Sequence, residues 1–236
     1  MENLKISQGQ TPENLFFRSG RRFMNSLQYT TREEAEAAYQ KRMCPDACIK
    51  EYLEMSGIPK RFKGKKIDDV QLRDTEAVDA VKSIQSYLKT FPDRLSAGAS
   101  GFLCGNCGTG KTLLACIIVE AVCCKGYAAH YTTAWKMLQQ IRKGYNREGS
   151  VNEYINEYVR KPLIVIDEIG IQHGSQDERV LLYQVLDGRY NDIRPTILIS
   201  NSKDPVKDGF LDMRIIDRLK DGGGFSITFS GESFRK

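Results

Sequence analysis

The chain has 236 residues, of which 41% are hydrophobic and 28% charged, a composition typical of a soluble globular protein with one sizeable domain and a smaller appendage. No apolar run approaches the roughly 20 residues of a membrane helix. The N-terminal sequence MENLKISQGQ also lacks the apolar core of a signal peptide. We therefore expect a cytoplasmic protein without a membrane segment. The seven cysteines are interpreted as reduced thiols.

The net charge of +5 is concentrated in the N-terminal third. Residues 1–66 contain 13 Lys and Arg against 8 Asp and Glu, whereas residues 67–236 contain 22 of each kind. Such an excess indicates an acidic partner, either nucleic acid or protein. A solvated basic surface is the alternative interpretation.

A small helical module is predicted over residues 31–56. Thr31 and Glu34 have the spacing of a capping box, which predicts the start of a first helix. Pro45 should break this helix or open a second one that ends at Gly57. The basic stretch 60–66 follows as a linker. We therefore divide the chain into an N-terminal helical, basic module with its linker, residues 1–66, and a second domain, residues 67–236.

In the second domain, strand and helix patterns alternate after a helix at 75–90 and a turn-rich stretch at 92–100. Strands are expected at 102–104, 128–132, 163–167, 196–200 and 225–229. Helices are expected at 110–124, 133–144, 151–159, 175–190 and 211–220. This alternation predicts an α/β fold of three layers, a parallel sheet with helices on both faces.

The octet GNCGTGKT, between the first strand and the following helix, fits a phosphate loop. Its backbone N–H groups and the helix N-terminus would bind the phosphates of ATP or GTP. Lys111 should reach the β- and γ-phosphates, and the Thr112 hydroxyl should hold Mg²⁺. Cys104 and Cys107 also form a CxxC pair, but they lie within the loop and lack a second ligand pair, which argues against zinc. The expected nucleotide-binding residues are Gly105, Asn106, Cys107, Gly108, Thr109, Gly110, Lys111, Thr112 and Leu113.

Two further strands are predicted to deliver polar side chains to the same edge of the sheet. Asp167 and Glu168 end the apolar run at 163–167, where ligands bind in open α/β sheets. Asp167 can orient Mg²⁺, and Glu168 can polarise an attacking water. Asn201 follows the next strand and can hydrogen-bond that water or the γ-phosphate. The alternatives are a surface carboxylate at a strand end and an asparagine that starts a turn.

Three arginines complete the set of candidates. Arg214 and Arg218 are four residues apart on one helix face, and such an arginine can stabilise charge on a neighbouring subunit's γ-phosphate. Arg235 follows the last strand and could reach the phosphates of its own subunit. Taken singly, each would be an exposed basic residue.

These elements in this order resemble the AAA+ ATPases: GNCGTGKT resembles Walker A, IVIDE Walker B and Asn201 sensor 1. The run from 163 to 201, then MRIIDRL and SFRK, is similar to the DnaC-type replicative helicase loaders and to the related IstB-type transposition helpers. The resemblance covers roughly residues 50–236. It is most specific at 101–115, 163–201 and 214–219, and weak over residues 1–50.

The resemblance implies roles that the residues alone do not. Arg218 matches the arginine finger, Arg214 its neighbour in that motif, and Arg235 the sensor 2 arginine, although the usual helical lid is missing. It further implies an ATPase that assembles into a spiral, whose N-terminal helices grip a DnaB-type hexameric helicase and which loads it onto single-stranded DNA in replication initiation. Residues 31–56 would then contact the helicase.

The same resemblance suggests DNA contacts on the helix at 133–144 and in the loop after Walker B. The candidates are Arg142, Lys143, Tyr145 and Ser175, of which the tyrosine could stack on a base. A solvated basic helix end is the alternative.

Three rival functions remain at this point. A transposition helper would bind duplex DNA and a transposase, and the short N-terminal module favours a loader over it. A small-molecule kinase has little need of Glu168, Asn201 or the arginine pair. A nucleotide-gated adaptor that does not hydrolyse ATP would have no use for Glu168 as a base.

Overall fold

The computed structural model describes residues 46–146, 150–170, 176–209 and 211–234. Packing divides the chain into two units, residues 1–48 and 49–236. The capping box at Thr31, like most of the predicted helical module, lies outside the described residues. None of the helices in the described ranges combines the length and the apolar character needed to cross a bilayer.

The second unit is a parallel five-stranded sheet in the order β2-β3-β4-β1-β5. The strands are β1 (Gly101–Gly105), β2 (Ala129–Thr133), β3 (Leu163–Ile169), β4 (Thr196–Ser200) and β5 (Phe225–Phe229). The helices are α3 (Asp46–Met55), α4 (Thr75–Lys89), α5 (Phe91–Ser96), α6 (Lys111–Cys124), α7 (Ala134–Arg142), α8 (Val151–Val159), α9 (Gln176–Asn191) and α10 (Met213–Lys220). Short 3₁₀ turns lie at Lys60–Phe62, Ile67–Asp69, Lys143–Asn146 and Asp221–Gly223.

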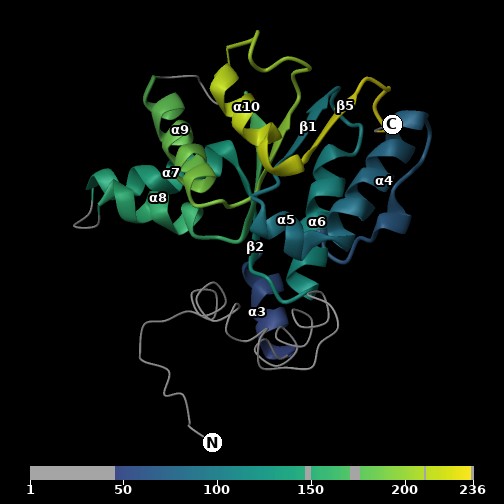
Figure 1. Cartoon of the computed structure of the whole chain (residues 1–236), viewed down its shortest axis with the longest axis horizontal. Coiled ribbons are helices and arrows are strands. Elements are labelled where there is room, and N and C mark those ends of the chain that lie inside the picture. Colours follow the sequence, from purple (N-terminus) through teal and green to yellow (C-terminus); the bar gives the residue numbers. More distant parts are fainter. Residues whose placement is uncertain (1–45, 147–149, 171–175, 210, 235–236) are drawn as a thin grey trace, which may run out of the picture. The chain divides into compact units, whose positions relative to one another are not determined.

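Helices cover both faces of the sheet, so the predicted three-layer α/β fold is confirmed (Figure 1). Successive strand residues point to opposite faces. Leu103 and Val165 therefore pack in the core under α4, α5 and α6, whereas Phe102 and Ile164 pack under α7, α8, α9 and α10. Every β1, β3 and β4 residue except Glu168 is buried, as expected for a parallel sheet covered on both sides.

One expected turn region is a helix. The stretch 92–100 was expected to be rich in turns, but its first half belongs to α5. Pro92 fits the first turn, where its missing N–H is not needed. Phe91 and Leu95 are one helical turn apart and only 0% and 4% exposed, so burial of this apolar face stabilises the helix.

Residues 49–66 belong to the second unit. Tyr52, Leu53 and Phe62 lie against its core, and Ile58 is part of that core. The Tyr131 N–H on the edge strand β2 donates to the Ser56 carbonyl oxygen at 2.7 Å. The division by packing therefore falls between Cys48 and Ile49, before the boundary expected at residue 66.

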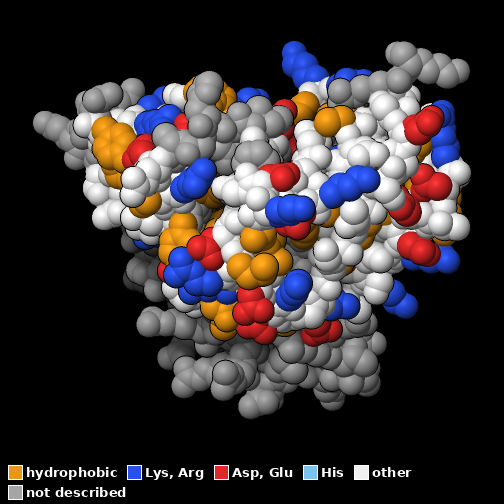
Figure 2. Space-filling view, turned by 90° about the horizontal axis from the view of Figure 1, so that it is seen from above, with side chains coloured by type: hydrophobic (Ala, Val, Ile, Leu, Met, Phe, Trp, Pro, Cys, Tyr) orange, Lys and Arg blue, Asp and Glu red, His pale blue; other side chains and the backbone are white. Residues whose placement is uncertain are grey.

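Charged side chains of both signs share the face shown in Figure 2, with apolar side chains between them. This mixture agrees with the equal numbers of acidic and basic residues in 67–236. A surface with charges of both signs interspersed creates little long-range electrostatic field.

Arg189 on α9 joins the amino-terminal ends of β3 and β4 from a fully buried position. Its guanidinium donates to the carbonyl oxygens of Tyr158, Val159, Lys161 and Pro195 and to the Thr196 hydroxyl, at 2.6–3.1 Å. Burial lowers the pKa of Arg189 to about 9. The group thus remains charged at neutral pH and donates to carbonyl oxygens near the amino-terminal ends of β3 and β4.

We expect Arg189→Met to lower the free energy of unfolding by about 3 kcal/mol, because the substitution leaves buried acceptors without a donor. Urea denaturation would measure the loss. Arg179→Met, at an exposed position of the same helix, is the control and should leave the midpoint unchanged. Equal midpoints for both variants would contradict the structural role of Arg189.

Candidate nucleotide-binding site

The octet 105–112 forms the turn between β1 and α6, as predicted. Gly110 precedes the first helical residue with a φ of 92°, a left-handed conformation that favours glycine. At Gly105, an added Cβ would collide with the Phe229 carbonyl oxygen. The two glycines therefore permit the close chain path that aims backbone N–H groups at a bound anion.

Lys111 begins α6 and is only 4% exposed. Its Nζ donates to the carbonyl oxygens of Gly105 at 2.9 Å and Asn106 at 2.6 Å. The loop thus holds a buried ammonium group at the N-terminus of a helix. Both the charge and the helix dipole favour phosphate at this position.

Asp167 is the centre of a hydrogen-bond network at the carboxyl end of β3. Its Oδ2 accepts from the Thr112 hydroxyl at 2.8 Å and from the Tyr131 hydroxyl at 2.9 Å. Its Oδ1 accepts from the N–H of Glu168 at 2.6 Å. Burial raises the pKa of Tyr131 above its ordinary value, and the Asp167 carboxylate raises it further, so the phenol stays a neutral donor.

Thr112 and Asp167 fit a magnesium ion that accompanies a nucleotide. Mg²⁺ prefers oxygen ligands and is usually bound through one or two protein groups together with phosphate oxygens. The 2.8 Å contact places two such oxygens side by side next to the phosphate loop. Within the described ranges there is no group of three or more His, Cys, Asp or Glu side chains that could hold a metal ion.

Glu168 is the one exposed residue of β3. The strand pairing is irregular between Ile166 and Ile169, and the φ of Glu168 is 61°. A bulge of this kind turns a side chain away from its regular position, and strained backbone is common at functional sites. The irregularity thus exposes a carboxylate directly beside Asp167, which suits a group that must reach a water molecule.

Asn201 directly follows β4, and the strand order explains why it lies near the phosphate loop and Asp167. β4 pairs with β1 on one side and β3 on the other, so it separates the strand of the phosphate loop from the strand of Asp167. Asn201 is exposed at the end of this middle strand. The fold therefore brings Lys111, Thr112, Asp167, Glu168 and Asn201 to one edge of the sheet.

The chain after β5 packs against the phosphate loop. The Asn106 side chain donates to the carbonyl oxygens of Ser230 and Gly231 at 2.8 and 3.0 Å, and the Phe234 N–H donates to Gly108 at 2.9 Å. The Arg73 guanidinium lies over the Phe234 ring at 5.0 Å. Arg235, the predicted sensor 2 residue, itself lies outside the described residues.

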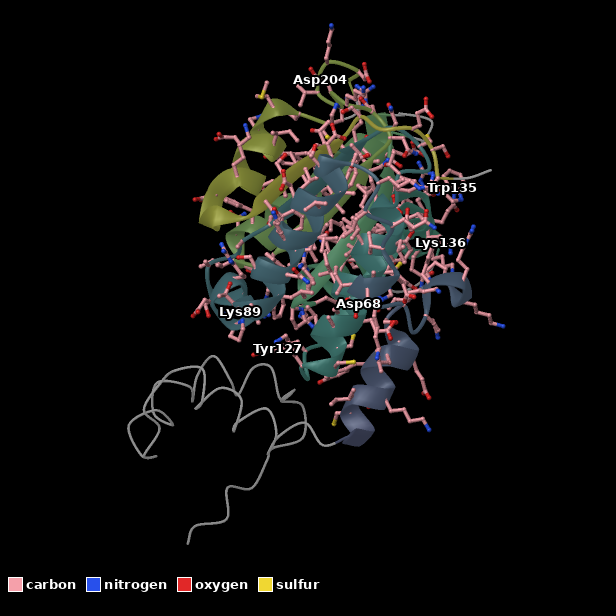
Figure 3. All side chains as sticks on the ribbon, turned by 90° about the vertical axis from the view of Figure 1, so that its right-hand side faces the viewer. Asp68, Lys89, Tyr127, Trp135, Lys136 and Asp204 are labelled. Atoms are coloured by element: carbon pink, nitrogen blue, oxygen red, sulfur yellow. The ribbon has the colours of Figure 1, made fainter. Side chains whose placement is uncertain are left out.

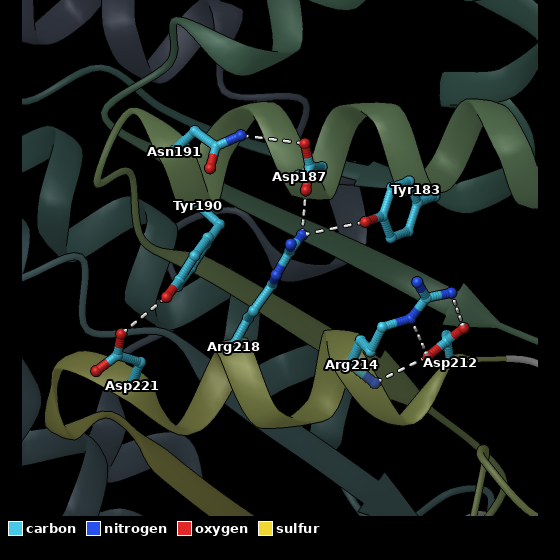
Figure 4. Close-up of polar contacts among 8 residues, drawn as sticks. All are labelled: Tyr183, Asp187, Tyr190, Asn191, Asp212, Arg214, Arg218 and Asp221. Carbon is cyan, nitrogen blue, oxygen red and sulfur yellow. Dashed lines mark hydrogen bonds and ion pairs between the residues drawn. The ribbon is translucent and has the colours of Figure 1, made fainter.

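Arg214 and Arg218 are not part of this group of residues. Arg218 lines a cavity of about 350 Å³ together with Ser100 and Thr196, which stand at the amino-terminal ends of β1 and β4. Arg218 pairs with Asp187 on α9, and Arg214 with Asp212 (Figure 4). The Arg218 guanidinium thus lies away from the Thr112–Asp167 pair of its own chain.

Two of the four predicted DNA-contact residues are engaged with acidic side chains of α9. Arg142 pairs with Asp177 at 3.2 Å and Glu178 at 3.3 Å, and the Tyr145 hydroxyl also donates to Asp177. Lys143 is exposed and donates to Gln140 on its own segment. Ser175 lies outside the described residues. The charge of Arg142 is therefore offset locally, which the sequence pattern does not reveal.

Sequence reasoning missed two features of this region. Tyr131 reaches Asp167 from β2, and only the pairing of β2 with β3 makes that contact visible. Trp135 and Lys136 lie at the start of α7 and are exposed, with 43% of Trp135 accessible (Figure 3). A tryptophan at an exposed helix start was a signal in the sequence that could have been used.

Comparison with known families supports a nucleotide-binding role. The model of the IstB-like ATP binding proteins matches residues 22–236. The chain belongs to this family. The description of the family agrees with the phosphate-loop geometry at Lys111 and Thr112.

Among curated relatives, the chain is similar to replicative helicase loaders. It is 26% identical to the replicative helicase loader DnaC of Escherichia coli K12 over 181 residues, which are 76% of this chain and 73% of the relative. It is 28% identical to the DnaC of Buchnera aphidicola subsp. Baizongia pistaciae over 183 residues, which are 77% and 73% of the two chains.

Solved structures share the fold at lower identity. A DnaC helicase loader superposes with a TM-score of 0.63 at 18% identity, covering 73% of this chain and 100% of that one. AMPPCP-bound DnaA from Aquifex aeolicus gives a TM-score of 0.59 at 19% identity, covering 73% and 51%. These likenesses establish an AAA+ fold for the second unit, as predicted.

The Tyr131–Asp167 contact leads to a test of the proposed Mg²⁺ site. We expect Tyr131→Phe to raise the Mg²⁺ concentration required for half-maximal ATP binding about tenfold, because an outer partner that orients a ligating carboxylate is lost. Titration of a fluorescent ATP analogue at varied Mg²⁺ would measure it. Tyr154→Phe on α8 removes a hydroxyl outside the site and serves as the control. An unchanged Mg²⁺ dependence of Tyr131→Phe would contradict the role.

Proposed function

We propose that this chain is an ATP-hydrolysing loader of a replicative hexameric helicase onto single-stranded DNA. The observation that carries the proposal is the separation of Arg218 from the nucleotide site of its own chain. If Arg218 acts on ATP from its place near the amino-terminal ends of the strands, that ATP belongs to a neighbouring subunit, so the complete site would form between subunits. The similarity to proteins named replicative helicase loader supports the choice of partner.

Hydrolysis is proposed to proceed as follows. The backbone of the phosphate loop and Lys111 bind the phosphates, while Thr112 and Asp167 hold Mg²⁺, which supplies charge neutralisation when it is bound. Glu168 accepts the proton of the attacking water, and Asn201 orients that water or the γ-phosphate. Arg218 from a neighbouring subunit offsets the charge that develops on the transferred phosphoryl group, and Arg214 supports it in the same motif.

Glu168→Gln tests the role of the carboxylate. The variant should bind ATP normally and lose at least about 100-fold in turnover, because the amide cannot accept the proton. Phosphate release would measure turnover, and retention of labelled ATP would measure the trapped complex. Glu232→Gln, in the segment after β5, is a control for the change of charge. Unchanged turnover in Glu168→Gln would refute its assignment as the base and favour an adaptor that does not hydrolyse ATP.

The N-terminal residues are proposed as the part that binds the helicase. Their excess of Lys and Arg over Asp and Glu suits an acidic surface on the partner. Residues 49–56 already pack on the ATPase unit, so the helicase contact is assigned to the preceding residues, and α3 marks the limit for a truncation.

Co-purification with a DnaB-type helicase, with and without ATP, tests this assignment. We expect the full chain to bind the helicase. A variant lacking residues 1–45, which keeps α3 intact, should lose helicase binding and still bind ATP. Equal binding by both would overturn the N-terminal assignment. Failure of the full chain to bind would favour the alternative of an IstB-like transposition helper, which the family match also allows.

For single-stranded DNA we propose contacts along α7. Trp135 and Lys136 offer an exposed ring and a cation at the start of the helix, and Lys143 and Tyr145 follow its end. Stacking of bases on aromatic rings, with cations along the backbone, is the usual basis of binding without sequence preference. Arg142 contributes less in this proposal because two carboxylates of α9 engage it.

A further inference from the structure

The packing of α10 on α9 fixes the Arg218 side chain in one orientation (Figure 4). Its Nη1 donates to Oδ1 of Asp187 and, at 3.4 Å, to the Tyr183 hydroxyl. The guanidinium lies 5.0 Å from the centre of the Tyr190 ring and 5.8 Å from that of Tyr183. Asp187 is itself held, since its Oδ2 accepts from the Asn191 amide at 3.1 Å.

This arrangement leaves part of the guanidinium available. Within the described part of the chain, neither Nη2 nor Nε of Arg218 has a hydrogen-bond partner, and 31% of the side chain is exposed. A planar guanidinium can bind one oxyanion through one nitrogen and a second through the remaining donors. The Asp187 contact is therefore compatible with a phosphate on the other donors of Arg218.

Arg214 on the same helix shows the contrasting arrangement. Its Nε and Nη2 both donate to the Asp212 carboxylate, at 3.1 and 2.8 Å, so this edge is already occupied. Its side chain is 72% exposed. The two arginines thus differ at Nε and Nη2, which are bonded to a carboxylate in Arg214 and are not in Arg218.

We propose that Asp187 is a positioning residue for Arg218, holding the guanidinium extended toward the nucleotide of a neighbouring subunit; this inference rests on the proposed function of Arg218. A free arginine side chain has many rotamers, and an arginine fixed beforehand does not lose that rotamer entropy in the transition state. The ion pair also raises the pKa of Arg218, chiefly through the hydrogen bond that its guanidinium donates to Asp187, so the group stays charged.

The test is the steady-state ATPase of the full chain, at a protein concentration where turnover per subunit no longer rises. Asp187→Asn should lower kcat about tenfold and leave KM for ATP within about twofold, since ATP binds to the phosphate loop of another subunit. Asp187→Glu should restore part of kcat. Asp217→Asn makes the same change of charge at an exposed position beside Arg218 and should behave as the unaltered protein.

Non-additivity separates positioning from a merely structural ion pair. In an Arg218→Ala background, Asp187→Asn should cause no further loss of kcat, because the residue acts through the arginine. A structural role would instead lower the melting temperature and reduce kcat by the same factor in both backgrounds. Asn191→Ala, at the exposed end of α9, removes the second support of Asp187 without touching the core and should give a smaller loss of kcat.

The outcomes distinguish this inference from the function on which it rests. If Arg218→Ala lowers kcat but Asp187→Asn leaves it unchanged or raises it, positioning is overturned and the action of Arg218 on a neighbour stands. A rise would mean that Asp187 restrains the arginine. If Arg218→Ala leaves kcat unchanged, the proposed intersubunit site fails, and the positioning role fails with it. If Asp187→Asn does not fold, Asp187→Glu and Asn191→Ala decide the question by the same criteria.

Discussion

The Asp167 carboxylate is the group on which the geometry of the nucleotide site depends. It accepts hydrogen bonds from Thr112 at the start of α6, from Tyr131 on β2 and from the backbone of Glu168. Each donor belongs to a different part of the chain, so this one buried acceptor fixes the phosphate loop against the sheet. A buried carboxylate needs such partners, because desolvation without them would be costly. The bulge that exposes Glu168 begins at the same residue.

Strand order and helix packing place the candidate site residues in two separate parts of the second unit. Insertion of β4 between β1 and β3 brings Asn201 among the phosphate-binding and acidic residues. The packing of α10 against α9 instead places Arg218 near the amino-terminal ends of the strands. In the proposed assembly, each ATP would therefore be bound by one subunit and its hydrolysis promoted by the next. Nucleotide binding and subunit contact would then be coupled through the same charged groups.

In three places the packing of the chain adds contacts that the local sequence pattern does not indicate. The proline and small residues at 92–100 indicated turns, yet burial of Phe91 and Leu95 stabilises a helix. The basic composition up to residue 66 indicated one module, but Ile58 belongs to the core of the second unit and Phe62 packs against that core. Arg142 looked like a free cation until α9 brought Asp177 and Glu178 beside it. In each case the deciding contact joins residues distant in the chain or buries a side chain in the core. The local sequence pattern shows neither of these.

The sequence by itself determined the alternation of strands and helices, the phosphate loop and the positions of Asp167, Glu168 and Asn201. These follow from local rules, since apolar periodicity, glycine spacing and strand ends are written in neighbouring residues. The tertiary structure alone decided that Tyr131 orients Asp167, that a bulge exposes Glu168, and that Asp187 and Tyr190 hold Arg218. Those contacts join residues that strand order and helix packing bring together, and neither can be read from spacing along the chain.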